Sequence, residues 1–406
     1  MTSPETVATT IAARFSNPRV VVSGNHSTPW VVLSAIEDQV PAFRLWALNA
    51  QEGMPDRDGI VLETCFVGPG MRGSNRLRYV PCRLSLVPVL FRTTLVPDVV
   101  VVHTSRVVGG QLSLGTEVNV LPAALEQCRA HGGILVAQVN PQMPYTFGDG
   151  ELSAETFDHV VEVDEPLLNV SSIPIDDVSR SIGERVARLV PDGATIQMGI
   201  GAVPNASLLG VVSRRGLRIW SEMFSDGVLA LDERGALDPV DPLVASFVFG
   251  SQRLYDWVDR NQRIRLLRTE TTNDPSRIAA QPQMVSVNAA LQVDLFGQAN
   301  ASRIDSRIYS GFGGQTDFVV GALHSPGGQA LIAMRSWQPK ADASTIVAMV
   351  DEPVTSFQHS AVLTEHGVAS IWGYSQREQA HNLIEQAAHP DVRDELWEEA
   401  VALGLT

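Results

Sequence analysis

PDVVVVHT, residues 97–104, decides the class of fold. Its four consecutive valines leave no polar position to face water, which is typical of a strand buried on both faces of a parallel sheet. GILVAQV, residues 133–139, is a second such run, and residues 122–130 between the two have the pattern of a helix. Strands that alternate with helices at this spacing predict an α/β architecture.

The same alternation extends toward both ends of the chain and starts afresh after residue 177. Residues 149–177 contain acidic residues but no lysine or arginine and end in the proline-containing sequence IPIDD, a composition that suits a domain boundary. We therefore expect two α/β domains, residues 1–177 and 178–406. Helices are predicted at 178–189 and strands at 194–198, 243–249 and 330–334, and 376–403 reads as two helices broken at His389–Pro390.

Composition excludes several classes of function. The chain has 406 residues with 44% hydrophobic and 18% charged side chains and a net charge of −15, so it is globular and suited neither to nucleic acid nor to an anionic membrane. It lacks an apolar run of membrane-spanning length and a signal-peptide pattern, and we expect a soluble protein of the cytoplasm. Cys65, Cys82 and Cys128 form no CxxC pair, and the histidines lack metal-ligand spacing, so neither disulfides nor a metal are expected.

A stretch in the second half, VSVNAALQVDLFGQ (residues 285–298), carries the first signal of a binding site. Apolar and polar residues alternate from Val285 to Leu295, which predicts one half-buried strand. Its polar face would present Asn288, Gln292 and Asp294 beside glycine-rich loops, an arrangement that suits a small-molecule site. A surface strand followed by an ordinary glycine loop is the alternative.

Three glycine-rich turns accompany this stretch. GIGAVPN (residues 199–205) follows a predicted strand but has Pro204 near the place of the third glycine of a dinucleotide-binding motif, so we do not assign it to that motif. What remains is a helix N-terminus whose N–H groups can face an anion or a developing oxyanion. SGFGGQTDF (residues 310–318) and SPGG (residues 325–328) are the other two, and together they predict a bound ligand.

Titratable residues near these turns are candidates for acid-base chemistry. The acids are Glu222, Asp226, Asp294, Asp317 and Glu365, and the histidines worth testing as bases are His26, His324 and His366. Lys340 is the only lysine, which disfavours Schiff-base chemistry. Arginines 72, 76, 78 and 83 form either a phosphate-binding loop or a solvated one.

The chain resembles the acetyl-CoA hydrolase/transferase family along most of its length. The resemblance rests on GIGAVPNA (199–206), SEMFSDG (221–227), VNAALQVDLFGQANAS (287–302), SGFGGQTDFVVGALHSPGGQ (310–329), LTEHGVA (363–369) and AAHPDVRDEL (387–396). FVGPGMRG, RYVPCRLSLVP and PDVVVVHTS resemble the N-terminal half of that family.

The resemblance implies two CoA-transferase-like α/β domains with the active site at their junction, and a homodimer. It also implies an acyl-CoA as the small-molecule partner, with coenzyme A as a substrate or cosubstrate instead of a tightly bound cofactor. The residues expected at coenzyme A or at the reacting carbonyl are Gly199, Gly201, Ala202, Val203, Pro204, Gly311, Gly313, Gly314, Gln315, Asp317 and Phe318.

Gln292 departs from the family pattern. The family uses a glutamate in a segment of the form INSAxEVDLxGQ, whose carboxylate attacks the thioester and then carries coenzyme A, and Gln292 occupies the matching position. A carboxamide is a far weaker nucleophile. Gln292, Glu222 and Glu365 are therefore the catalytic candidates, with Gln292 as an oxyanion donor and one of the acids, or a histidine, as activator of water.

Three interpretations of Gln292 remain open. The protein hydrolyses acyl-CoA or performs a related acyl-CoA reaction, or it is an ordinary CoA-transferase in which an engineered change replaced glutamate by glutamine, or it binds CoA esters without turning them over. STIV (residues 344–347) also stands where the family has an arginine-containing SRIV. These departures leave the acyl group undefined.

Overall fold

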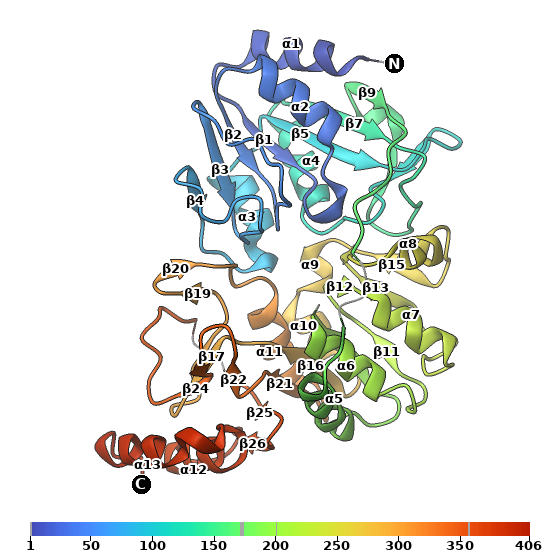
Figure 1. Ribbon diagram of the computed structural model, residues 1–406. Coiled ribbons are helices and arrows are strands. Elements are labelled where there is room, and N and C mark those ends of the chain that lie inside the picture. The colour runs from blue at the N-terminus through green and yellow to red at the C-terminus, as the bar shows by residue number, and fades with distance from the viewer. Residues whose placement is uncertain (1, 171–173, 200, 356–357) are drawn as a thin grey trace. The chain divides into compact units, whose positions relative to one another are not determined.

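The computed structural model describes residues 2–170, 174–199, 201–355 and 358–406 (Figure 1). The chain forms two compact units. Unit 1 consists of Met1–Ser171, Pro242–Thr272 and Tyr309–Gly313, and unit 2 of Ser172–Asp241, Asn273–Ile308 and Gly314–Thr406. Each unit is built on a mainly parallel sheet with helices, which confirms the α/β class. The division into domains at residue 177 stays a prediction, and the compact units differ from it because two later segments return to unit 1.

Unit 1 contains a seven-stranded sheet in which every neighbouring pair is parallel. In spatial order the strands are β4 (Leu77–Tyr79), β3 (Ile60–Thr64), β2 (Phe43–Trp46), β1 (Arg19–Val22), β5 (Val99–Thr104), β7 (Ile134–Val139) and β9 (His159–Glu162). All residues of β5 and β7 are buried. The two apolar runs at 97–104 and 133–139 are thus confirmed as central strands covered on both faces.

Helices and short strands complete unit 1. The helices are α1 (Pro4–Arg14), η1 (Asn25–Ser27), α2 (Trp30–Gln39), η2 (Leu84–Leu86), α3 (Val87–Thr93), α4 (Leu121–Ala130), η3 (Ala154–Thr156), α8 (Gln252–Val258) and α9 (Thr269–Thr272). The short strands are β6 (Gln111–Ser113), β8 (Glu151–Ser153), β13 (Leu243–Ala245), β14 (Phe247–Val248) and β15 (Ile264–Leu266). The single strand predicted at 243–249 is therefore wrong, because Ser246 separates β13 from β14.

Unit 2 contains a six-stranded sheet. In spatial order it consists of β11 (Arg218–Ile219), β10 (Thr195–Met198), β16 (Met284–Asn288), β21 (Gln329–Ala333), β25 (Ala361–Leu363) and β26 (Val368–Ser370). The first five strands are parallel, and β26 returns antiparallel to β25. The carboxyl ends of these five strands therefore lie along one edge of the sheet.

The helices of unit 2 include those predicted at 178–189, after the turn at 199–201 and in 376–403. They are α5 (Asp177–Leu189), α6 (Ala202–Gly210), α7 (Asp226–Glu233), α10 (Pro275–Ala279), α11 (Gln315–His324), α12 (Gln376–Asn382), the π-helical turn η4 (Leu383–Ala387), η5 (Pro390–Val392) and α13 (Arg393–Ala402). α5 starts at the side chain of Asp176, which accepts a hydrogen bond from Ser179 N at 2.9 Å. The predicted break at His389–Pro390 is confirmed, since η5 separates the two C-terminal helices.

The strand predicted from Val285 to Leu295 is wrong. β16 ends at Asn288, and Gln292 starts a different strand, β17 (Gln292–Asp294). β17 lies between β18 (Ala299–Asn300) and β24 (Ile346–Val347) in a separate small sheet. The remaining short strands of unit 2 are β12 (Met223–Phe224), β19 (Arg303–Ile304), β20 (Arg307–Ile308), β22 (Trp337–Gln338) and β23 (Ala343–Ser344).

Asp294 explains why the alternation of apolar and polar residues gave a wrong prediction. Its side chain is fully buried and does not belong to an exposed polar face. One carboxylate oxygen accepts from Phe296 N at 3.1 Å and Gln298 N at 2.8 Å, and the other from Gln298 Nε2 at 2.9 Å and Val350 N at 3.1 Å. Asp294 therefore closes the turn after β17 instead of facing a ligand.

Within the described ranges, every helix is too short or too polar to cross a membrane. The same part of the chain brings together no group of three or more histidine, cysteine or acidic side chains that could hold a metal ion.

Candidate active site

The carboxyl edge of the sheet in unit 2 gathers several of the candidate residues. Glu222 follows β11, Gly199 follows β10, Asn288 ends β16, Ser336 follows β21 and Glu365 follows β25. The chain leaves β10 toward β11 on one side, whereas β16 lies on the other side of β10. In parallel α/β sheets ligands bind outside the carboxyl ends of the strands, at the place where the strand order reverses. Here that place lies between Gly199 and Asn288.

The turn after β10 forms one wall of this edge. Gly201 has φ of 125°, a backbone conformation that favours glycine, and α6 begins at the next residue, Ala202. The structure describes no side-chain cap at the start of α6, so the N–H groups of its first turn are available to a partially negative oxygen. Val203 and Pro204 lie in this first turn, and Ile200 lies outside the described residues.

Polar side chains tie the ends of β10 and β16 together. Ser286 Oγ donates to Gln197 Oε1 at 2.6 Å, and Asn288 Nδ2 donates to Ser286 Oγ at 2.8 Å. Gln197 and Ser286 are buried, and Asn288 is half-buried. This chain of hydrogen bonds fixes Asn288 at the carboxyl edge. Neither Gln197 nor Ser286 was a candidate from the sequence.

Gln292 is half-buried at the start of β17. In the sheet Gln292 pairs with Asn300 of β18. The side chain of Gln292 accepts a long hydrogen bond of 3.4 Å at Oε1 from Asn300 Nδ2. The neighbouring residue Val293 is fully buried and pairs with Ile346 of β24. A strand with partners on both sides therefore holds the backbone of Gln292, while its amide group is only weakly engaged.

Glu222, at the carboxyl edge of the sheet, has a carboxyl group with a raised pKa. It is half-buried, and its Oε2 accepts a hydrogen bond from Asn273 Nδ2 at 2.9 Å. The pKa of Glu222 is raised to about 7, mainly by burial; the hydrogen bond from Asn273 opposes the shift, and the charge of Asp317 adds to it. A carboxyl group with such a pKa can give or take a proton near neutral pH.

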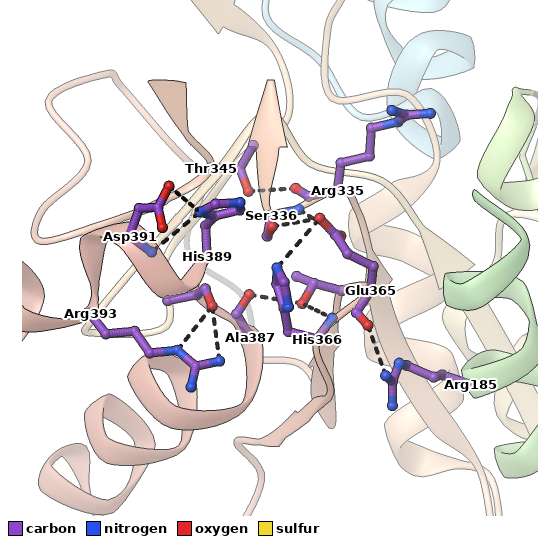
Figure 2. A network of polar contacts seen from close by, with 12 residues as sticks. Arg185, Arg335, Ser336, Thr345, Glu365, His366, Ala387, His389, Asp391 and Arg393 are labelled. Carbon is purple, nitrogen blue, oxygen red and sulfur yellow. Dashed lines mark hydrogen bonds and ion pairs between the residues drawn. The ribbon is translucent and has the colours of Figure 1, made fainter. Parts of the chain in front are cut away.

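Glu365 is held by a different set of contacts, which Figure 2 shows. Its carboxylate accepts from Ser336 Oγ at 2.6 Å through one oxygen and from Ser336 N at 3.0 Å through the other. Its backbone carbonyl accepts from Arg185 at 2.8 Å. The carboxylate thereby joins the loops after β21 and β25, and both of its oxygens already have donors.

His366 lies next to Glu365 in the same network (Figure 2). Its Nε2 is 3.8 Å from Glu365 Oε1, and its ring centroid is 5.3 Å from that of His389. Burial lowers the pKa of His366, while the charge of Glu365 opposes this shift. Burial therefore disfavours the charged ring, and the role of His366 as a base stays a prediction.

The segment from Gly311 to Phe318 divides between the two units. In unit 1, a Cβ at Gly311 would lie 2.5 Å from the carbonyl oxygen of Cys65, so glycine is required by close packing. In unit 2, Gly314 precedes α11, and Gln315 Nε2 donates to Ala289 O at 3.3 Å, beside the segment that leads to Gln292. Phe318 and Asp317 are fully buried, so ligand contacts from this segment would come from its backbone and from Gln315.

Two arginines of the arginine-rich loop of unit 1 form ion pairs with acids. Arg76 pairs with Asp56 and Asp58, and Arg78 Nη1 lies 2.6 Å from Glu63 Oε1. Arg72 stacks over the ring of Tyr309 at 3.9 Å from its centroid. These contacts favour a folded surface loop over a site that attracts phosphate.

Three kinds of similarity place the chain among known proteins. Residues 250–400 match the family model of the acetyl-CoA hydrolase/transferase C-terminal domain. The 4-hydroxybutyrate coenzyme A transferase of Clostridium kluyveri is 37% identical over 349 residues, which cover 82% of this chain and 80% of that protein. Acetyl-CoA hydrolase of Kluyveromyces lactis is 30% identical over 54% of this chain and 45% of its own length.

Solved structures of related proteins are similar to this chain over nearly its whole length. RipA from Yersinia pestis is 29% identical and superposes with a TM-score of 0.92, covering 100% of this chain and 98% of that one. The 4-hydroxybutyrate CoA-transferase from Porphyromonas gingivalis is 30% identical with a TM-score of 0.83, covering 99% and 97%.

Proposed function

The chain belongs to the acetyl-CoA hydrolase/transferase family, and on that premise we propose that it is an enzyme that hydrolyses acyl-CoA thioesters. The choice of water as acceptor is supported by the amide of Gln292, at the position where the family resemblance implies a nucleophilic glutamate. An amide oxygen does not form the acyl-glutamyl anhydride through which coenzyme A is transferred. Water then remains as the nucleophile.

Glu222 supports this proposal as the group that activates water. Its pKa of about 7 leaves a large fraction ionised at neutral pH, with burial as the main cause of the shift. Water attacks the carbonyl carbon of the thioester as the Glu222 carboxylate takes a proton. The C–S bond then breaks, and the departing sulfur of coenzyme A receives that proton, which leaves a carboxylic acid and free coenzyme A.

The oxyanion of the tetrahedral intermediate needs hydrogen-bond donors. We assign this role to Gln292 Nε2 and to the N–H groups at the start of α6, which Gly201 precedes. Backbone donors at a helix N-terminus stabilise a developing negative charge without reorganisation. The segment from Gly311 to Phe318 is assigned to coenzyme A, on the family resemblance.

CoA transfer to a second carboxylate is the other candidate function. It is favoured by the names of the relatives, several of which are CoA-transferases, and it requires a nucleophile other than Gln292. A noncatalytic CoA-ester-binding protein is the third. We further propose a cytoplasmic homodimer on the family resemblance, which light scattering coupled to gel filtration would test.

A panel of acyl-CoA thioesters, each incubated with and without acetate, tests these functions. Hydrolysis predicts free coenzyme A and a carboxylic acid at rates that acetate does not change. New CoA esters that appear only with acetate would instead establish transfer. Binding that raises the thermal midpoint without consumption of the thioester would overturn the enzymatic proposal.

A further inference from the structure

We propose that a pocket in unit 2, away from the candidate active site, binds the adenine base of a nucleoside or nucleotide. The pocket has a volume of about 350 Å³, which lies within the range of small-molecule sites. Its walls are the turn after β17, the chain before β25 and the loop between β26 and α12 (Figure 1). Binding of a base there does not depend on the proposed acyl-CoA hydrolysis.

The pocket lies at the amino edge of the sheet in unit 2. His359 shortly precedes β25, which begins at Ala361, and Ile371 directly follows β26, which ends at Ser370. Ala361 and Ser370 pair with each other, because β26 runs antiparallel to β25. Glu365 instead follows the carboxyl end of β25. The pocket and Glu365 are therefore at opposite edges of the sheet.

The side-chain amide of Gln298, in the turn after β17, is held in one orientation. Its Nε2 donates to Asp294 Oδ2 at 2.9 Å, and the backbone N of the same glutamine donates to Asp294 Oδ1 at 2.8 Å. A carboxylate only accepts hydrogen bonds, so the group that faces Asp294 is the NH2 end of the amide. Oε1 points away from Asp294, and no donor of the described residues reaches it. Gln298 therefore offers an acceptor to a ligand.

Gln379, on α12, offers a second acceptor. Its Nε2 donates to the backbone oxygen of Tyr374 at 2.8 Å, which again identifies the NH2 end. A Cβ at Gly297 would lie 3.3 Å from Gln379 Oε1, so this oxygen lies beside the turn that carries Gln298. Within the described part of the chain, Oε1 of Gln379 has no donor. A ligand that satisfies both oxygens must supply two N–H or O–H donors.

The rest of the lining favours an uncharged aromatic ligand. Trp372 is 58% exposed, and such an indole provides a face on which a base stacks. His359 is fully buried, and burial lowers its pKa to about 4, so its ring is neutral. The lining residues that the structure describes include no lysine, arginine, aspartate or glutamate. A charged group would lose hydration there without gaining an ion pair.

Adenine satisfies these features together. Its exocyclic amino group has two hydrogens, which match the oxygens of Gln298 and Gln379. Its ring nitrogens accept hydrogen bonds, and Gln376, which also lines the pocket, has an amide that can donate to them. The face of the base stacks on Trp372. The sugar and any phosphates are left to solvent, so a free nucleoside and the adenosine end of coenzyme A share the chemistry that is recognised.

Isothermal titration calorimetry of the full chain with adenosine, without any acyl-CoA, tests the proposal. Inosine, which has a carbonyl in place of the amino group, should bind about 10-fold more weakly or worse, because its oxygen would face the two amide oxygens. Trp372→Ala should weaken adenosine binding about 10-fold. Gln379→Met removes one acceptor at similar side-chain length, so it should weaken adenosine binding and leave the binding of inosine unchanged.

Tyr374→Ala is the matched control. Tyr374 is also an exposed aromatic residue, at 47%, but it does not line this pocket. Its backbone oxygen, to which Gln379 donates, stays in the variant. The affinity for adenosine should therefore not change. Trp372→Phe keeps an aromatic face and should retain most of the affinity, which separates loss of stacking from loss of fold.

Three results would each overturn the proposal: no adenosine binding at millimolar concentrations, equal affinity for adenosine and inosine, or unchanged affinity in folded Trp372→Ala. Competition then identifies the source of the base. Adenosine that still binds in saturating coenzyme A is a separate ligand, whereas displacement in the parent chain shows that coenzyme A places its own base in the pocket. All of these readouts are independent of turnover, so they stand whether or not acyl-CoA is hydrolysed.

Discussion

In our proposal, residue 292 carries an amide where the family resemblance implies a nucleophilic carboxylate. We expect Gln292→Glu to create CoA transfer to acetate, because the new carboxylate can attack the thioester and then carry coenzyme A. The covalent glutamyl-CoA would be cleaved by borohydride or hydroxylamine and detected by mass spectrometry of the peptide that contains residue 292. Gln338→Glu, at an exposed glutamine on β22, should give no adduct. Absence of both transfer and adduct in the Gln292 variant would contradict our assignment of the site.

Gln292→Ala tests the native role of the amide. Loss of one oxyanion donor lowers kcat by about 100- to 1,000-fold in comparable sites, and we expect a loss of that order in acyl-CoA hydrolysis. KM should change little, because the donor acts mainly on the transition state. A variant that hydrolyses at the parent rate would show that Gln292 lies outside the catalytic machinery.

The three cysteines are predicted to be unreactive in the folded protein. Cys65, Cys82 and Cys128 are buried, and burial raises the pKa of Cys128 to about 12. The hydrogen bond with the Cys82 thiol, together with burial, raises the pKa of Cys65 strongly. Since the thiolate is the reactive form, titration with an aromatic disulfide reagent should modify the thiols only when urea unfolds the chain. Rapid modification of the native protein would contradict this prediction.

At the scale of whole elements, the sequence predicts strands well where burial is uniform. PDVVVVHT and GILVAQV are covered on both faces in β5 and β7, so no solvent-facing pattern competes with their β-branched composition. The single strand predicted at 285–295 is wrong because burial there is not uniform. The alternation of apolar and polar residues is compatible with one strand. The buried Asp294, however, accepts four hydrogen bonds in a turn, and the alternation does not reveal such a turn.

The candidate site was predictable only where a motif marks it. The glycine turn at 199–201 and the family segment around Gln292 stand out in the sequence, whereas Asn273 and Gln197 carry no local signal. Asn273 lies 51 positions from its partner Glu222, and Gln197 lies 89 positions from Ser286. Such contacts depend on the order of strands in the sheet, and a single sequence does not reveal that order.

The buried carboxyl group of Glu117 in unit 1 is expected to make the stability of the fold depend on pH. Glu117 lies in the loop between β6 and α4 and accepts from Gly24 N at 3.0 Å, Asn119 Nδ2 at 3.1 Å and Asn25 Nδ2 at 3.1 Å. Asn25 and Asn119 both have positive φ, 45° and 23°. Burial raises the pKa of Glu117 from 4.5 to about 7, although these three hydrogen bonds oppose the shift.

The raised pKa of Glu117 determines how the stability of the fold changes with pH. A carboxyl whose folded pKa is raised contributes stability that is fully present below about pH 4.5 and is lost as the pH rises through about 7. Glu117→Gln cannot ionise, so its free energy of unfolding relative to the parent should rise by on the order of 3 kcal/mol across this window. Calorimetry from pH 4.5 to 8 measures the difference, with the exposed Glu395→Gln as control. A parallel pH dependence of parent and Glu117→Gln would contradict the prediction.

At the scale of the molecule, the two units have the same kind of sheet topology. Both sheets reverse their strand order once, between β1 and β5 in unit 1 and between β10 and β16 in unit 2. In unit 1 the loop after β1 contains Gly24 and Asn25, which bind Glu117, and in unit 2 the loop after β10 contains Gly199 and Gly201. Each reversal thus carries a glycine-containing turn, but only unit 2 places a family motif there.

The net charge of −15 affects how the whole surface attracts or repels a charged substrate. Coenzyme A esters carry several phosphate charges, so the acidic chain repels them at long range. Salt shortens this repulsion, since the Debye length falls from about 30 Å at 0.01 M to about 10 Å at 0.1 M ionic strength. We therefore expect kcat/KM for an acyl-CoA to rise a few-fold between these salt concentrations. An acyl-N-acetylcysteamine thioester, which lacks the phosphates, should show no such rise. A decrease of kcat/KM with salt would instead mean that local arginines attract the ester more strongly than the net charge repels it.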